Sequence, residues 1–65
     1  MSISFKDILA AVFDVYDDRG AVIWLTGDHI RMEDDSWRAS PMYLIEHGEY
    51  EIPMHAIRAL QAGYM

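Results

Sequence analysis

Histidines and carboxylates are the side chains of this sequence that could bind a metal ion or transfer protons. His29 follows Asp28, His47 follows Glu46, and His55 stands in a third segment. No two of these histidines are three or four residues apart, the spacing that places two ligands on one face of a helix. A metal site would need separate turns to converge, so we expect no metal ion and no other cofactor.

Enzymatic chemistry has little support in the sequence. Paired carboxylates hydrolyse glycosides only on either side of a substrate cleft, which 65 residues rarely enclose. Ser36, Ser40 and the histidines form no nucleophile elbow or triad pattern. We therefore expect a protein that is not an enzyme.

The charge balance points instead to a protein partner. Eleven acidic residues against five basic ones give a net charge of −6, which disfavours direct binding to nucleic acid or to an anionic membrane. A basic protein surface is the complementary partner. Solubility is the simpler explanation for such a charge, so the positions of the carboxylates must decide between the two.

The bulk properties of the chain indicate one domain over residues 1–65. A hydrophobic content of 52% supplies a core, although a small one. The absence of cysteine rules out disulfides and fits a reducing compartment. No signal peptide is evident, and no apolar run approaches the roughly 18 residues of a membrane span. We expect a cytoplasmic monomer that folds alone.

A helix is predicted near the N-terminus, over about Ser4 to Asp18. Ser4 or Ser2 can cap its start, and Gly20 can follow its end. Its apolar residues follow the helical repeat of one buried stripe. They are Phe5, Ile8, Leu9, Val12, Phe13 and Tyr16.

Carboxylates line the outer side of this predicted helix. Asp7, Asp14 and Asp18 would form a row with steps of roughly 10 Å and 6 Å, comparable to phosphate spacing along a nucleic acid. Asp17 lies one step around the cylinder. Asp17 and Asp18 would stand at the C-terminal end, where the helix dipole disfavours anions. An ordinary solvated face remains the alternative for this row.

A hairpin is predicted over residues 21–33, with Gly27 and Asp28 as its turn. Trp24 would face solvent opposite Arg31, where it could anchor a partner. Trp37, in the loop that follows, is assigned no function. The core face would consist of Ile23, Leu25, Ile30 and Met32.

A second hairpin is predicted over residues 42–53, around the turn His47-Gly48. Its core face would consist of Tyr43, Ile45, Tyr50 and Ile52. Glu46 would then oppose Glu49 directly, with Glu51 on the diagonal. Like charges in that arrangement are destabilising, so a basic partner would explain them. Neutralisation within the chain by Arg58, Arg38 or His47 is the alternative.

A short C-terminal helix from Pro53 completes an α+β domain, in which the N-terminal helix packs on an antiparallel sheet of three or four strands. The predicted partner-binding residues are the clustered carboxylates together with one tryptophan. They are Asp7, Asp14, Asp17, Asp18, Glu33, Asp34, Asp35, Glu46, Glu49, Glu51 and Trp24.

The acidic segments FDVYDDRG, RMEDDSW and IEHGEYE make the chain resemble the small acidic anti-CRISPR proteins that phages encode, especially inhibitors of type I systems such as type I-C. The resemblance lies in the character of the whole chain, because this class shares no motif and no catalytic residues. It implies an inhibitor that binds a DNA-binding subunit of a CRISPR interference complex in the host cytoplasm and keeps target DNA away by mimicking it.

Two other functions are compatible with the same residues. The chain could be a small regulatory or adaptor module that binds its partner through the Trp24 face, with its acidity serving solubility alone. It could also be an antitoxin-like neutraliser of a basic toxin, which the sequence does not separate from the inhibitor.

Overall fold

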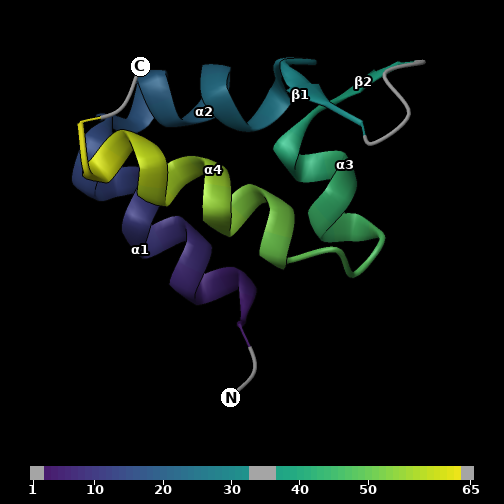
Figure 1. Ribbon diagram of the computed structural model, residues 1–65. Helices are drawn as coiled ribbons and strands as arrows, with labels where there is room; N and C mark the ends of the chain where they lie inside the picture. The colour runs from purple at the N-terminus through teal and green to yellow at the C-terminus, as the bar shows by residue number, and fades with distance from the viewer. Residues whose placement is uncertain (1–2, 33–36, 64–65) are drawn as a thin grey trace.

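The computed structural model describes residues 3–32 and 37–63, and these form a small α+β domain (Figure 1). The predicted fold class is confirmed, but the sheet has two antiparallel strands in the described residues, and the expected three or four strands are wrong. In chain order the elements are α1 (Phe5–Val15), α2 (Asp18–Thr26), β1 (Ile30–Arg31), β2 (Arg38–Ala39), α3 (Pro41–Glu46) and α4 (Glu51–Gln61).

Helix α1 begins as the sequence predicts. The Ser4 side chain accepts the Asp7 backbone N–H, and the Asp7 carboxylate accepts the Ser4 backbone N–H at 3.0 Å, which is a capping box. The predicted end at Asp18 is wrong, because Tyr16 is extended and the helix stops at Val15. Asp17 then caps a new helix by accepting the Gly20 backbone N–H at 2.8 Å.

Helix α2 occupies the segment predicted as the first strand of a hairpin. Ala21, Trp24 and Leu25 are buried, which is the i, i+3, i+4 spacing of a helix face. Ile23, predicted to face the core, is 63% exposed, and Val22 beside it is 60% exposed. Of the predicted hairpin, only a strand at Ile30 and Arg31 is present. It pairs with Ala39 and Arg38, so the predicted pairing with residues 21–26 is wrong.

Helices α3 and α4 replace the second predicted hairpin. Ser40 caps α3 by accepting the Tyr43 backbone N–H at 3.1 Å, and Pro41 takes the first helical position. Gly48, at φ 78°, makes the turn into α4. The predicted C-terminal helix is present but begins earlier, at Glu51.

The main core lies where α1 packs on α4 and α2 packs on α3 (Figure 1). Its fully buried centre is formed by Ile8, Val12 and Ile57. A smaller cluster of Ile30, Ala39 and Leu44 attaches the two-strand sheet to α3. Among the described residues, no helix is long and apolar enough to cross a membrane.

Candidate binding pocket

The pocket that we consider for function is an open hollow of about 360 Å³ between the two-strand sheet, α3 and the start of α4. Three of the exposed large apolar side chains, Trp37, Tyr43 and Ile52, border it. Their exposed fractions are 44%, 40% and 38%. Large apolar side chains at one hollow are what a binding site requires, whereas scattered ones need no explanation.

An aromatic row forms one side of this pocket. Tyr43 and His47 are four residues apart on α3 and its C-cap, so their rings lie on one face and stack with centroids 4.0 Å apart. Trp37 meets the Tyr43 ring edge-on, with centroids 5.3 Å apart. The row therefore runs from Trp37, just before β2, across Tyr43 in α3 to His47 at the C-terminal end of that helix.

The His47 ring is held in one orientation by the end of α3. Its Nδ1 lies 2.8 Å from the Tyr43 carbonyl oxygen, and because a carbonyl only accepts, Nδ1 donates. In the neutral ring Nε2 is consequently left as a hydrogen-bond acceptor. The same contact satisfies a carbonyl in the last turn of the helix.

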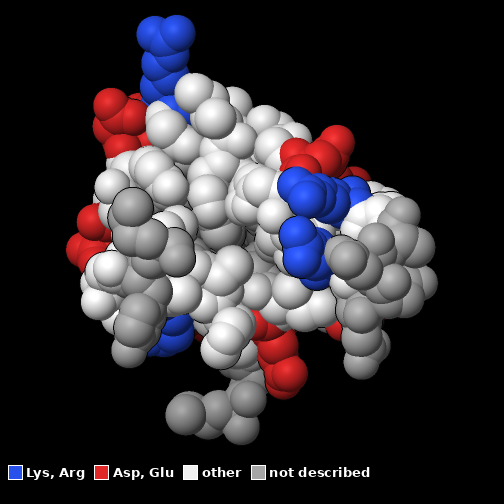
Figure 2. All heavy atoms as spheres, turned by 45° about the horizontal axis from the view of Figure 1, so that its top comes forward, with Lys and Arg blue, Asp and Glu red and all other residues white. Residues whose placement is uncertain are grey.

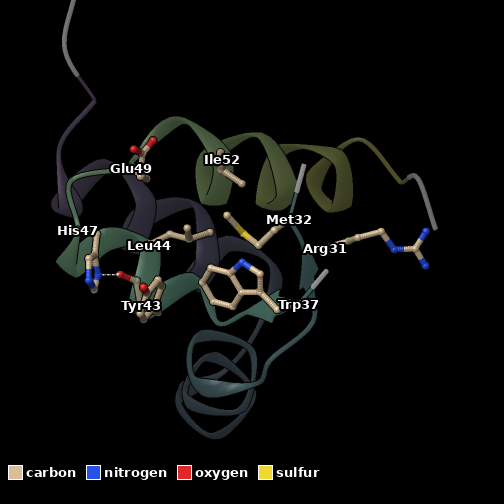
Figure 3. A pocket seen from close by; sticks show the side chains of 8 residues that line it. All are labelled: Arg31, Met32, Trp37, Tyr43, Leu44, His47, Glu49 and Ile52. Atoms are coloured by element: carbon tan, nitrogen blue, oxygen red, sulfur yellow. Dashed lines mark hydrogen bonds between the residues drawn. The ribbon is translucent and has the colours of Figure 1, made fainter. Parts of the chain in front are cut away.

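Glu49 and Ile52 lie on the opposite side of the pocket (Figure 3). Leu44 and Met32 lie between the two sides, so the base of the hollow is apolar. The Arg31 side chain extends away from the aromatic row in this view. Glu51 lines an adjoining hollow that shares Ile52 with the pocket.

The predicted acidic row on the first helix does not exist as one line, because α1 ends before Asp17. Asp7 belongs to the capping box, and its bonds from the Ser4 backbone and then the Ser4 hydroxyl hold the pKa of its carboxyl below the ordinary value of 3.8. Asp14 accepts a bond from Gln61 at 3.1 Å, while Asp17 and Asp18 stand at the start of α2. The expectation that Asp17 and Asp18 oppose a helix dipole is therefore wrong.

The predicted cross-strand pair of Glu46 and Glu49 is wrong as well, since no strand contains either residue. Glu46 ends α3, Glu49 lies in the connection, and Glu51 begins α4. All three side chains are exposed. Glu51 is in the first turn, where the helix dipole favours a negative charge.

Trp24 is not the exposed anchor that the hairpin predicted. It is only 7% exposed, in the main core, because it lies on the inner face of α2. The predicted residues Glu33, Asp34 and Asp35 lie outside the described residues.

The surface view in Figure 2 shows a broad area without charge, with acidic and basic side chains around its margins. The top of Figure 1, where α2 lies, comes forward in this view. No continuous acidic stripe crosses the described surface seen there. Carboxylates are therefore dispersed on this face.

The two histidines outside the pocket lie in different segments of the chain. The Nε2 of His29 lies 2.8 Å from the Trp24 carbonyl oxygen at the end of α2, and His55 is exposed on α4. Within residues 3–32 and 37–63, no group of three histidine, aspartate or glutamate side chains could hold a metal ion.

The aromatic row was missed in the sequence because residues 42–53 were assigned to a hairpin. The i, i+4 pair of Tyr43 and His47 after Ser40-Pro41 was the available signal, since serine followed by proline marks a helix start. Trp37 carried no pattern of its own, because its place depends on the pairing of Arg38 with Arg31. No protein-family model, curated protein or solved structure matches this chain.

Proposed function

We propose that this protein is a non-enzymatic acidic inhibitor that binds a basic, nucleic-acid-binding surface of a partner protein in the cytoplasm. The specific partner is a DNA-binding subunit of a type I CRISPR interference complex, which the resemblance to anti-CRISPR proteins implies. The inhibitor would compete with target DNA for that surface.

The observation that carries this proposal is that every acidic side chain among the described residues is exposed to solvent. Three of the eleven acidic residues lie outside the described residues, and the remaining eight are all exposed. None of them is used to neutralise a buried charge, since no charged side chain among the described residues is buried. Exposed carboxylates in excess remain available to arginine and lysine side chains of a partner.

The fold changes the form of mimicry that we propose. Because α1 ends before Asp17, a regular row with phosphate spacing does not explain the competition. The inhibitor would instead supply negative charge from several elements, and exclude DNA by occupying the same basic groove. Glu46, Glu49 and Glu51 form one such group, at the end of α3, in the connection that follows and at the start of α4.

A triple variant tests this function directly. In Glu46→Gln, Glu49→Gln, Glu51→Gln, retention of the CRISPR interference complex from a host lysate should fall, and target DNA should regain access to the complex. Asp28→Asn, an exposed carboxylate in the connection after α2, serves as the matched control and should bind like the parent. Undiminished binding by the folded triple variant would refute the proposal.

An adaptor module remains the second candidate, now through a different surface. Burial of Trp24 removes the face on which that alternative depended. The pocket beside Trp37 and Tyr43 supplies another apolar contact area. An adaptor would bind through that area with little dependence on the three glutamates.

A further inference from the structure

We infer that the pocket between the two-strand sheet, α3 and α4 receives an arginine side chain from the basic partner. This inference rests on the proposed function, because it names how one basic residue of that partner would be held. It adds the aromatic row of Trp37, Tyr43 and His47 to Glu49, which is one of the exposed carboxylates of the proposed function.

The aromatic row is suited to a planar cation. Trp37 and Tyr43 present π-systems at 44% and 40% exposure, and a guanidinium over such a ring face is attracted by its quadrupole. The T-shaped contact between these rings, with centroids 5.3 Å apart, fixes their orientation before a ligand arrives. Arginine is favoured over lysine because its flat group stacks on rings.

The hydrogen-bonding groups of the pocket also match a guanidinium, which only donates. Glu49 lines the rim of the pocket, and although Figure 3 shows its carboxylate turned away from Tyr43 and Trp37, rotation of this exposed side chain would let its two oxygens accept a forked pair of N–H bonds. His47 donates through Nδ1 to the Tyr43 carbonyl, so Nε2 of its neutral ring is a further acceptor. Acceptors on an aromatic row distinguish this pocket from a purely apolar groove.

The apolar base suits the rest of the side chain. Leu44, Met32 and Ile52 line the hollow, and the aliphatic stem of an arginine can pack on them while its head stays at the mouth. Arg31 also lines the pocket, but Figure 3 shows its side chain extending away from the aromatic row. The volume of about 360 Å³ is at the small end for ligand sites, which fits one side chain better than a drug-sized molecule.

Charge complementarity selects this occupant over an apolar one. The chain has a net charge of −6, and Glu51 lies at the adjoining hollow that shares Ile52. A cation entering the pocket therefore approaches Glu49 in its lining and Glu51 in the adjoining hollow, with Arg31 extending away from the aromatic row, whereas an apolar side chain would gain nothing from the carboxylates.

The test uses the whole protein and a short synthetic peptide with one central arginine among glycines. Its control peptide carries citrulline, which has the same shape without the charge. The indole N–H signals of Trp37 and Trp24 are followed by nuclear magnetic resonance. We expect the arginine peptide to shift the Trp37 signal saturably and to leave Trp24, which is 7% exposed, in place.

Two variants assign the contacts. Glu49→Gln should weaken peptide binding about two- to fivefold, the range for a surface ion pair. Trp37→Leu keeps an apolar side chain but removes the ring, and should weaken binding by a similar factor when followed at Tyr43. Asp14→Asn removes the same charge on α1 and should bind like the parent, and unchanged Trp24 signals show that each variant is folded.

Equal binding of the citrulline peptide, or tighter binding of a phenylalanine peptide, would overturn the inference. So would an arginine peptide that leaves Trp37 unshifted. The proposed function fails separately. If the triple glutamine variant loses the interference complex while Trp37→Leu retains it fully, the inhibitor stands and the arginine pocket does not. If the arginine peptide binds as expected but no interference complex is retained, the pocket stands and the named partner does not.

Discussion

At the scale of single residues, several carboxylates stabilise helix N-termini in addition to any role in binding a partner. Asp7, Asp17, Asp18 and Glu51 all lie at a helix N-cap or in a first helical turn. Backbone N–H groups point outward there, and the helix dipole favours negative charge. Substituting these four would alter stability and binding together, so Glu46 and Glu49 are the cleaner positions for binding studies.

Asp7 gives a prediction for acid stability. Because its folded pKa lies below the ordinary 3.8, Asp7 stabilises the fold above that value, and this stabilisation is lost as pH falls through the folded pKa. Asp7→Asn should therefore be less stable than the parent near neutral pH and approach it in strong acid. Urea unfolding at both extremes measures this difference.

Asp28→Asn is the control for that experiment, as an exposed carboxylate outside the helices. It should follow the parent at both extremes. A constant stability difference between Asp7→Asn and the parent at every pH would contradict the capping role of the charge.

At the scale of elements, α1 and α4 could be predicted from the sequence better than the segments between them. The start of α1 was predictable because Ser4 and Asp7 form a recognised cap and the apolar period continues behind them. The exposure of two residues of that apolar stripe was not predictable: Phe5 is 37% exposed and Phe13 is 51% exposed. Ala11, which the predicted stripe left out, is buried in the main core instead.

The two predicted hairpins failed for a shared physical reason. Residues such as Val22, Ile23 and Ile45 favour strands in isolation, but that preference amounts to about 1 kcal/mol and yields to tertiary packing. The caps at Asp17 and Ser40 start helices there, and each helix buries an i, i+3, i+4 set. The pocket could not be predicted for the same reason, because two of the elements that line it, α3 and the start of α4, were assigned as strands.

His29 provides a test of how α2 ends. Its Nε2 donates to the Trp24 carbonyl, and its ring lies 5.3 Å from the Trp24 ring. His29→Ala should lower the free energy of unfolding by about 1 kcal/mol, the net worth of one such hydrogen bond. Thermal unfolding followed by circular dichroism measures the loss.

His55→Ala, on the exposed side of α4, is the matched histidine control. It should change the free energy of unfolding by less than about 0.5 kcal/mol. Equal losses in the two variants would show that the cap at the end of α2 contributes nothing specific.

At the scale of the whole molecule, stability depends on a few side chains. A domain of 65 residues buries a smaller fraction of its surface on folding than a larger domain does, so its margin against unfolding is narrow. The helices enclose the main core in two packed pairs, α1 with α4 and α2 with α3. Loss of one central side chain should therefore affect the whole fold.

Two isoleucines make that prediction specific. Ile57 is fully buried, so Ile57→Ala should cost about 2–5 kcal/mol and leave much of the protein unfolded. Ile23→Ala, at 63% exposure on α2, should change stability by less than about 0.5 kcal/mol. A large loss at Ile23 would favour the hairpin in which this residue faces the core.

Salt separates the two candidate functions. Affinity of an acidic inhibitor for a basic partner should fall steeply with added salt, because exposed charges are screened over about 8 Å at physiological ionic strength. An affinity that stays level between low and high salt would favour the adaptor module. Titration of the retained partner at several salt concentrations gives the answer.

The packing of α1 against α4 also sets the order of events during synthesis. The apolar face of α1 is synthesised well before α4, its main packing partner and the last of the described helices. Ile8 and Val12 cannot pack against Ile57 until α4 has been synthesised. The main core can therefore be completed only after α4 has been synthesised, although α2 and α3 can pack on each other earlier.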